Sequence, residues 1–487
     1  MPNKLNFRKL FKNHNKYLVT ISVAAGVMFA LLNAWLVTKE LFILPIATLT
    51  VAGLYFFIFR LKTLVYLMAF LTPFSVLLND ADYNIGLSLP GEPIMIMVSL
   101  LFLMRLFFDI RWDKKVMFHP ISIVIYLYLI WMFICCFTSE LPLVSFKFLA
   151  SKIWFITACY AVVIYAFKEH FKGVEIYFRC YAAALAVIVM ITSVKHAFHG
   201  FNKDVGHWIM SPYYNDHTAY GAVLALFIPI VAAFLFKPGS SKLLKSFYAL
   251  ILTILLIGLY LSFSRAAWLS LVGMMGVWVV LKLRIKFSWI VATILFCGVL
   301  FWSFQTEIMH TLNKNSQDSS ANISEQLQSM SNISTDASNV ERLNRWVSAF
   351  GMVRERPVFG FGPGCYQFCY APFQKPKYKT IITTSFGDGG NAHSEYFGPL
   401  AETGIVGMLT VILLLSVTLY YGIKTYITAR DKNIKTMVLG VILGLTTYII
   451  HGVLNNFLDT DKLSLPFWGC LALIVLSYFE VEKQKEG

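Results

Sequence analysis

Long uninterrupted runs of apolar residues recur along the whole chain. The first, from Leu18 to Leu32, lies in a charge-free segment long enough to cross a bilayer, which takes roughly 20 apolar residues. Similar runs follow, each bounded by charged or turn-forming residues. The pattern predicts fourteen transmembrane helices, at residues 17–38, 41–59, 62–78, 92–108, 120–138, 150–167, 174–196, 217–236, 246–263, 266–282, 287–304, 404–423, 434–452 and 463–479.

The predicted fold class is an all-α polytopic membrane protein with about 12–14 transmembrane helices and one large, partly helical periplasmic loop. The count is a range because the second and third spans, like the ninth and tenth, are joined by very short links. Composition agrees with this class. Of the 487 residues, 57% are hydrophobic and 14% charged, whereas a soluble protein is about a quarter charged.

The net charge of +15 would suggest nucleic acid in a soluble protein. Here the basic surplus lies in alternate connections between spans, such as 168–172, 237–245 and 424–435. Lys and Arg collect on the cytoplasmic side of membrane proteins. We therefore expect both termini in the cytoplasm, membrane lipids as surroundings, and no nucleic-acid partner.

The longest external connection divides the chain into three parts. Residues 1–304 hold eleven helices, 305–403 form a periplasmic catalytic loop, and 404–487 hold three helices and a cytoplasmic tail. Within the loop, the Ser/Asn-rich stretch 313–339 has little to bury and is expected to be flexible. Residues 340–403 contain Trp, Phe, Pro and Gly and are expected to fold.

Cysteines and paired aspartates are the candidates for cross-links and metals. Cys365 and Cys369 lie outside the membrane and either pair in an oxidising periplasm or stay free. Two Asp-x-Asp pairs, Asp80/Asp82 and Asp459/Asp461, have the oxygen ligands of a divalent-cation site, but solvated loops also account for them. We predict no metal and no cofactor.

Arg265, in Leu-Ser-Phe-Ser-Arg, stands between two apolar spans at the predicted outer face. An arginine there either snorkels to lipid headgroups or binds an anion, because guanidinium matches phosphate oxygens with a two-pronged fork. Glycines 360, 362 and 364 form a run in which Gly362 and Gly364 either bring backbone N–H groups near phosphate or make a turn.

Two helices are predicted around these elements. Residues 339–357 begin at a capping Asn339 and end at Pro357. On this helix Arg342, Arg345 and Trp346 share one face by their i, i+3, i+4 spacing, either as part of a site or as a solvated face. An apolar stripe on the same helix suits the membrane surface and consists of Val347, Phe350 and Met352.

The second helix is expected to begin at Asn391, to hold His393 in its first turn, and to kink at Pro399 on the way to the twelfth span. An imidazole at the membrane boundary suits a general base, since its ordinary pKa lies near the working pH. A structural histidine is the alternative.

Taken in order, these pieces resemble a known family. Ser-Phe-Ser-Arg265 is followed by Arg342-x-x-x-Trp346, by Arg-Glu-Arg-Pro-Val-Phe-Gly-Phe-Gly-Pro-Gly at 354–364, and by Ala-His393-Ser-Glu395-Tyr-Phe. Over residues 262–407 the chain resembles the bacterial O-antigen ligase / O-antigen polymerase family of membrane glycosyltransferases. Residues 211–221 also resemble that family's segment before a helix.

The resemblance implies transfer of a glycan from undecaprenyl-pyrophosphate at the periplasmic face. It implies that Arg265 and Arg342 engage the pyrophosphate, with Arg345 as a close rival to Arg342, and that His393 activates the acceptor. Ser394 stands where the family pattern leads us to expect asparagine. The site is thus predicted to contain catalytic residues His393, Arg265 and Arg342, and substrate-binding residues Arg345, Trp346, Gly362, Gly364 and Glu395.

The leading prediction is a metal-independent, inverting enzyme of the O-antigen ligase type with a lipid A-core acceptor. A polymerase with a growing polysaccharide as acceptor, or a protein O-oligosaccharyltransferase, shares the chemistry and differs in acceptor. A polysaccharide transporter or lipid flippase is the alternative from another class. Such a protein would need charged residues or broken helices near mid-membrane.

Overall fold

The computed structural model describes residues 43–80, 85–108, 113–285, 337–376 and 389–486, with a few positions between 28 and 36. In these ranges nine helices are long and apolar enough to cross a membrane, which confirms the all-α polytopic class. They are α6 (Pro120–Phe137), α7 and α8 (Pro142–Ile156 and Val162–Phe167, joined by the π-helical turn Thr157–Ala161), α9 (Lys172–Phe198), α11 (His217–Leu235), α12 (Lys242–Leu261), α13 (Arg265–Leu283), α18 (Phe397–Thr428), α19 (Lys432–His451) and α20 (Asp461–Glu486).

The chain divides into a unit that ends at Leu64 and a second that begins at Val65. The site described below belongs to the second unit. The other described elements are α3 (Ile43–Leu71), the 3-10 turn Thr72–Phe74, β1 (Val76–Asp80), β2 (Ile85–Leu89), α4 (Gly91–Phe108), α5 (Lys114–Met117), α10 (Lys203–Gly206), α16 (Ala337–Glu355), α17 (Tyr366–Cys369) and the 3-10 turn Ala371–Phe373.

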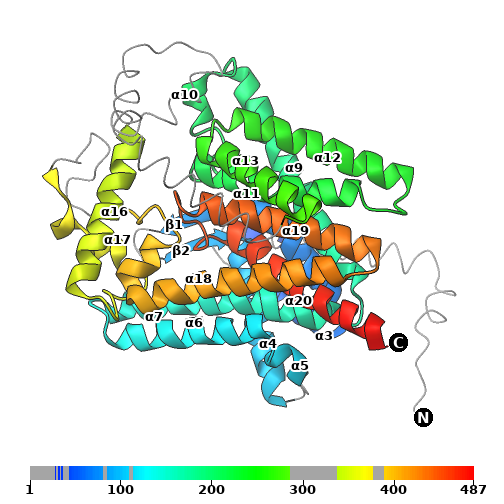
Figure 1. Ribbon diagram of the computed structural model, residues 1–487, viewed down its shortest axis with the longest axis horizontal. Helices are drawn as coiled ribbons and strands as arrows, with labels where there is room; N and C mark the ends of the chain where they lie inside the picture. Colours follow the sequence, from blue (N-terminus) through cyan, green and yellow to red (C-terminus); the bar gives the residue numbers. More distant parts are fainter. Residues whose placement is uncertain are drawn as a thin grey trace. The chain divides into compact units, whose positions relative to one another are not determined.

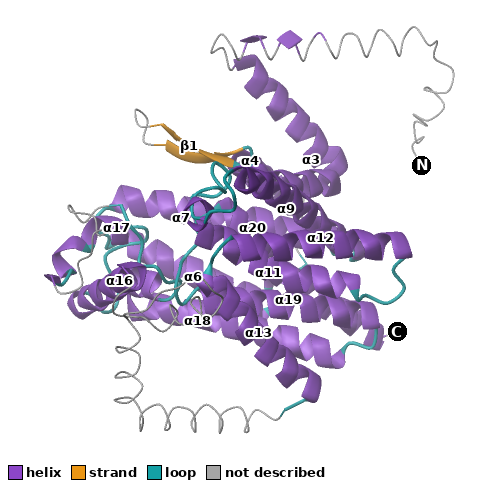
Figure 2. Cartoon of the chain, turned by 90° about the horizontal axis from the view of Figure 1, so that it is seen from above, coloured by secondary structure: helices purple, strands orange, loops and turns teal. Residues whose placement is uncertain are grey.

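The predicted span 62–78 is wrong in its second half. The helix ends at Leu71, because Pro73 has no amide N–H to continue the hydrogen-bond ladder. Val76–Asp80 instead pairs with Ile85–Leu89 as an antiparallel hairpin (Figure 2), a small β element in a fold predicted to be all helix. The predicted spans 41–59 and 62–78 also share one helix, α3, which is broken at Arg60 (φ −143°, ψ 42°).

Ten predicted spans are helices, namely those from 92–108 to 463–479 apart from 287–304, and several are longer than predicted. The span predicted at 150 begins at Pro142, where proline's fixed φ and missing N–H suit a first helical turn. The span predicted at 404 begins at Phe397. Span 287–304, most of span 17–38 and the stretch predicted to be flexible, up to residue 336, lie outside the described residues.

Burial distinguishes central helices from peripheral ones. Helices α11, α19 and α20 are mostly buried, whereas α12 and α13 turn most of their apolar surface outward. Helix α11 packs against α12, α13 and α19. A helix that is apolar on all sides is stable only inside a protein or a membrane, so the outward faces of α12 and α13 indicate lipid contact.

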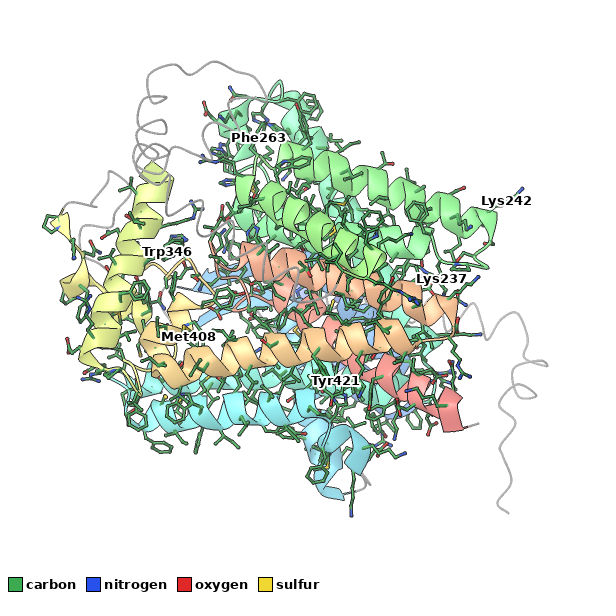
Figure 3. All side chains as sticks on the ribbon, in the orientation of Figure 1. Lys237, Lys242, Phe263, Trp346, Met408 and Tyr421 are labelled. Carbon is green, nitrogen blue, oxygen red and sulfur yellow. The ribbon has the colours of Figure 1, made fainter. Side chains whose placement is uncertain are left out.

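The bundle of the second unit has two unlike ends. We call one the loop end: α6, α9, α12 and α19 finish there, α7, α11, α13, α18 and α20 begin there, and α16 lies across it (Figure 1, left). Trp346 lies at this end and Lys237 and Lys242 at the other (Figure 3). The basic connections therefore gather opposite the candidate site. That the basic end faces the cytoplasm stays a prediction.

Candidate functional site

Helix α16 presents two of the predicted residues to the loop end of the bundle. The Arg342 Nε donates to the Leu454 carbonyl oxygen at 3.1 Å, in the connection between α19 and α20. The Trp346 indole N–H points to the His393 carbonyl oxygen at 3.5 Å. The helix covers residues 337–355, close to the predicted 339–357, and lies over both segments that carry the site.

Arg345, one turn away, lies inside the protein. Its side chain is 4% exposed, and its Nε donates to Glu341 Oε1 at 2.6 Å. The guanidinium carbon lies 4.1 Å from the centre of the Tyr370 ring. Tyr366 donates its hydroxyl to the Arg345 carbonyl oxygen at 2.7 Å. Arg345 is thus held by α16 itself and by Tyr366 and Tyr370, whereas the half-buried Arg342 reaches toward the bundle.

The apolar stripe predicted on α16 does not form one surface. Phe350 is 47% exposed, but Met352 is fully buried in a small core with Ala349, Phe361 and Tyr366. Val347 is half-buried. Residues 347 and 352 are five positions apart, which places them on different sides of a helix. Met352 therefore packs into this small core and not onto the membrane surface.

His393 precedes α18. The prediction that it lies in the first turn of this helix is wrong. Its φ is +48°, a left-handed backbone that few non-glycine residues adopt. The His393 N–H donates to Asn391 Oδ1 at 3.0 Å, so Asn391 makes a local turn. Ser394, three residues before the helix, accepts with its Oγ from the Tyr396 and Phe397 amides at 3.2 and 3.4 Å.

The kink in α18 also differs from the prediction. It lies at Gly404 (φ +72°, ψ −172°) rather than at Pro399. Pro399 is the third residue of the helix, where a missing amide N–H breaks no ladder bond. Gly404 permits a positive φ that other residues resist. Its neighbour Ile405 donates its N–H to the Pro357 carbonyl oxygen at 2.9 Å.

The surroundings of His393 keep its imidazole neutral. Burial, and then the positive charges of Arg342 and Arg345, lower its pKa to about 4, against weaker opposing effects of Glu341 and Asp216. A neutral imidazole at pH 7 has a lone pair that can accept a proton. Arg342 and Asp216 thus both lie within electrostatic range of the ring.

Arg265 is the first residue of α13. The preceding turn has Phe263 at φ +49°, and Ser264 lies so close to α11 that a Cβ on Gly221 would be 2.7 Å from the Ser264 Cβ. A helix N-terminus already carries a partial positive charge, and its first turn here contains no acidic residue. Arginine side chain and helix terminus therefore add their charges, as expected for an anion-binding position.

The C-terminal end of α19 lies near both the start of α13 and Arg342 of α16. His451, its last residue, lies beside the backbone of Ala266 and within electrostatic range of Arg342 and Asp216. The structure thus brings Arg265, Arg342 and His393 to one end of the bundle. His451 and Asp216 join them without having been selected from the sequence. Both stand at the predicted outer ends of spans 434–452 and 217–236, and that shared position was the available signal.

Asp216 has a second, structural role at the start of α11. Its Oδ1 accepts from the Thr218 amide at 3.0 Å and caps the helix. It lies 2.9 Å from His217 Nδ1, and the His217 ring stacks on His207 with centroids 4.5 Å apart. This segment belongs to residues 211–221, which the resemblance singled out.

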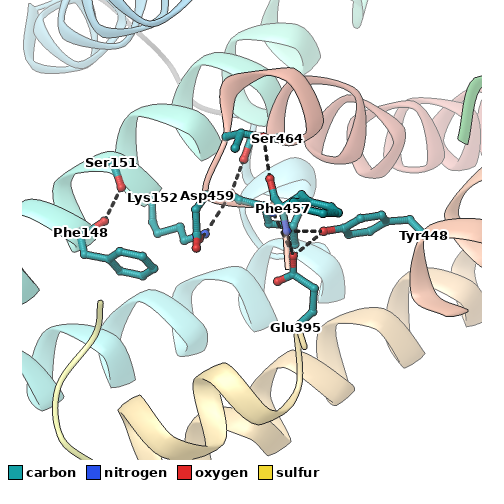
Figure 4. A network of polar contacts seen from close by, with 10 residues as sticks. Phe148, Ser151, Lys152, Glu395, Tyr448, Phe457, Asp459 and Ser464 are labelled. Atoms are coloured by element: carbon teal, nitrogen blue, oxygen red, sulfur yellow. Dashed lines mark hydrogen bonds and ion pairs between the residues drawn. The ribbon is translucent and has the colours of Figure 1, made fainter. Parts of the chain in front are cut away.

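Glu395, predicted to bind substrate, ties the His393 segment to the connection between α19 and α20. Its Oε1 accepts from the amides of Phe457 at 2.7 Å and Leu458 at 2.9 Å, and from the Tyr448 hydroxyl (Figure 4). Burial, and then the nearby charge of Asp459, raise the pKa of this carboxyl group. Three hydrogen bonds to one oxygen make Glu395 a positioning residue for its neighbour His393.

The glycine run packs against protein backbone. Gly362 (φ +110°) donates its N–H to the Glu402 carbonyl oxygen at 2.8 Å, and a Cβ there would collide with Ser139. Gly364 (φ +74°) lies so close to Phe148 that a Cβ would approach its ring to 3.0 Å. Close packing accounts for both glycines, of Gly362 on Ser139 between α6 and α7 and of Gly364 on Phe148 of α7.

Cys365 and Cys369 do not form a disulfide, and Asp459 and Asp461 each pair with a lysine. Cys365 and Cys369 are both free thiols, and the Cys365 Sγ lies 3.3 Å from Ser139 Oγ. Asp459 pairs with Lys152 at 2.6 Å and Asp461 with Lys462 at 3.4 Å. Asp82 lies outside the described residues. Within the described ranges, no three His, Cys, Asp or Glu side chains are placed to hold a metal ion.

Comparison with known proteins agrees with the motifs. Residues 248–412 match the model of the O-antigen ligase family, a range that includes Arg265, Arg342 and His393. An uncharacterized protein of Haemophilus influenzae is 26% identical over 251 residues, which cover 51% of this chain and 60% of that relative. The resemblance read from the sequence is confirmed: this multi-pass membrane chain contains a domain of the O-antigen ligase family over residues 248–412.

Proposed function

We propose that the protein is a membrane glycosyltransferase of the O-antigen ligase type. It moves a glycan from undecaprenyl-pyrophosphate to a hydroxyl of a lipid A-core acceptor at the periplasmic face of the inner membrane, with both termini in the cytoplasm. The family match supports a glycosyltransferase-like role. One observation carries the proposal: His393 lies within electrostatic range of Arg342, at the end of the bundle where Arg265 begins α13.

In this mechanism His393 accepts the proton of the acceptor hydroxyl. The acceptor oxygen attacks the anomeric carbon of the donor, and the bond from that carbon to the phosphate oxygen breaks. Undecaprenyl-pyrophosphate leaves with the electron pair, and attack opposite the leaving group inverts the anomeric centre. Negative charge grows on the phosphate oxygens, where the guanidinium groups of Arg265 and Arg342 stabilise it by charge-assisted hydrogen bonds. We propose that these arginines replace a metal ion.

Polymerase and protein O-glycosylation activities would use the same chemistry with another acceptor. A transporter or flippase would use its charged groups along a path through the membrane. The convergence of Arg265, Arg342 and His393 on one end of the bundle favours an enzyme.

The test is glycan transfer by the full chain in lipid nanodiscs. Undecaprenyl-pyrophosphate glycan is supplied with lipid A-core, with free polysaccharide, or with an acceptor protein, each with and without a chelator. We expect transfer to lipid A-core, unaffected by the chelator. Transfer to another acceptor would reassign the type within the family, and movement of the lipid-linked glycan without transfer would indicate a flippase.

His393→Ala should abolish transfer while insertion and thermal stability stay near those of the parent, because the attacking hydroxyl loses its base. His170→Ala is the matched control, since His170 is exposed in the turn between α8 and α9 at the other end of the bundle. Near-normal transfer by a well-folded His393→Ala protein would remove the proposed base.

A further inference from the structure

The break in α18 at Gly404 opens the backbone of this helix to other parts of the chain. In an unbroken helix the Ile405 N–H would donate to the Ala401 carbonyl oxygen. Here it donates to the Pro357 carbonyl oxygen at 2.9 Å, and the Ala401 carbonyl oxygen accepts from the Phe361 N–H at 3.1 Å. The break thus replaces helical hydrogen bonds by bonds to the segment that follows α16.

The next two carbonyl groups of α18 are bonded in the same way. The Glu402 carbonyl oxygen accepts from the Gly362 N–H at 2.8 Å. The Thr403 carbonyl oxygen accepts from the indole N–H of Trp131, in α6, at 2.8 Å. Since a backbone carbonyl group that leaves the helical ladder needs another partner, the break bonds α18 to residues 357–362 and to α6.

Two glycines let these backbones meet. Gly404 (φ +72°) and Gly360 (φ +65°) both have a left-handed backbone conformation, which glycine adopts without strain. A Cβ on Gly404 would collide with the Val358 carbonyl oxygen, and a Cβ on Gly360 would collide with the backbone of Glu402. The contact between α18 and residues 357–362 therefore depends on both glycines.

The side chain of Glu402 adds a link to α16. Its Oε1 accepts from the Tyr366 N–H at 3.2 Å, and the Gly364 amide lies beside the same carboxyl group. Tyr366 in turn donates its hydroxyl to the Arg345 carbonyl oxygen of α16 at 2.7 Å. Because Arg345 is one turn from Arg342, a single residue connects this carboxyl group to the part of α16 that carries Arg342.

Resting on the proposed function, we propose that the break in α18 is the docking element for residues 357–366, and that Glu402 is a positioning residue for Arg342. Glu402 holds Tyr366, and Tyr366 holds α16. The helix in turn keeps Arg342 within electrostatic range of His393. Misplacing a reacting group by about 1 Å can lower a rate about 100-fold, so Glu402 affects transfer without touching the substrate.

Docking is tested without catalysis, by hydrogen–deuterium exchange of the full chain in nanodiscs. Mass spectrometry reports the exchange of the amides in residues 357–366. In Glu402→Met the Tyr366 N–H loses its acceptor, and exchange over this segment should become about tenfold faster or more. In Glu402→Gln the side-chain amide oxygen still accepts, so exchange should stay within about threefold of the parent's.

Glu175→Met is the matched control for the loss of a hydrogen-bonded carboxyl group. Glu175 is buried near the start of α9, at the end of the bundle opposite the loop end, and accepts from Arg179 at 3.0 Å and from the Tyr248 hydroxyl at 2.9 Å. This variant should leave exchange over residues 357–366 near that of the parent. Equal acceleration by Glu175→Met and Glu402→Met would overturn the docking role of Glu402.

Gly404→Ala tests the break itself. The added Cβ is strained at this φ and collides with residue 358, so exchange over residues 357–366 should again become faster. Gly276→Ala is its control, because a Cβ on Gly276 in α13 would have no atom within 4 Å. Exchange like the parent's in both Gly404→Ala and Glu402→Met would overturn the docking element.

Glycan transfer then tests the positioning role. Glu402→Met should lower kcat/KM for the lipid-linked donor about 10- to 100-fold. It should also move the acidic limb of the pH profile to higher pH, because Arg342 and Arg345 would no longer lower the pKa of His393. Glu402→Gln should keep the limb in place and the rate within about threefold of the parent's.

Two results would overturn the positioning role. One is faster exchange in Glu402→Met with an unmoved acidic limb, since Arg342 would then stay in place without the docking. The other is loss of transfer in Glu402→Gln with exchange like the parent's, which would mean that Glu402 acts on the substrate itself. If the parent transfers no glycan, the proposed function fails, while the exchange experiment still decides whether the break docks residues 357–366.

Discussion

The segment before α18 has two unlike sides. On one, Arg342 and Arg345 lie around His393, and the N-terminus of α13 brings Arg265 to the same end of the bundle. On the other, Glu395 lines a cavity together with Glu402 and Asp459, and its pKa is raised by burial and by the charge of Asp459. One side carries positive charge, and the other holds buried carboxyl groups.

In the proposed reaction the leaving group needs positive charge where the bond breaks. The arginine side of this segment supplies that charge beside the proposed base. A backbone held by Asn391 on one side of His393 and by Glu395 on the other keeps the imidazole at the boundary.

The largest effect on the positive side should come from Arg265. Arg265→Lys keeps the charge but loses the two-pronged fork, and we expect transfer to fall about 100-fold or more, the usual cost of losing a transition-state donor. Single-turnover transfer rates with bound donor measure it. Lys282→Arg, at the other end of α13, is the control. A rate near the parent's would leave Arg265 as a headgroup-binding residue.

A smaller effect with a distinct signature is expected at Arg342. The pKa of about 4 predicts that His393 stays neutral, and transfer persists, when the pH falls from 7 to 5. Arg342→Gln removes a neighbouring positive charge, so the pKa rises and the acidic limb of kcat/KM moves to higher pH.

Arg342→Lys tests the effect of the positive charge on the pKa of His393 separately from its effect on the transfer rate. It should leave the acidic limb in place even if transfer slows, because the positive charge remains. The limb is read from the pH profile and not from the rate at one pH. An unshifted limb in Arg342→Gln would mean that another group controls the profile.

The helices were predictable because their apolar runs are long and each ends in a charge, a proline or a glycine. The failures lie where local contacts outweigh that pattern. Pro73 ends α3 early, and the following residues find a strand partner in Ile85–Leu89. At His393 the sequence showed a capping residue, Asn391, but not that Ser394 would accept hydrogen bonds from the amides just before and at the start of α18.

The site was predictable only as a set of residue types at span ends. Arg342 and Arg345 share a helix face and a charge, so spacing alone could not rank them. Burial ranks them. The i, i+4 spacing relates Glu341 to Arg345, but no periodicity relates Tyr370 to it. The cavity was invisible for the same reason, since Lys152 and Asp459 are distant in sequence and meet only when α7 packs near α20.

The smallest effect on transfer, and a large one on stability, is expected at Arg345. Arg345→Met removes the ion pair from the buried Glu341, and losing one side of a buried ion pair destabilises a protein by about 3–5 kcal/mol. Thermal unfolding in nanodiscs should show the loss, while transfer per folded molecule stays within a few-fold of the parent. Combining Arg345→Met with Glu341→Leu should restore much of the stability, since no charge is then left unpaired. If Arg345→Met instead abolishes transfer in protein that stays folded, Arg345 rather than Arg342 binds the pyrophosphate, and the two sides of the His393 segment would have to be redrawn around it.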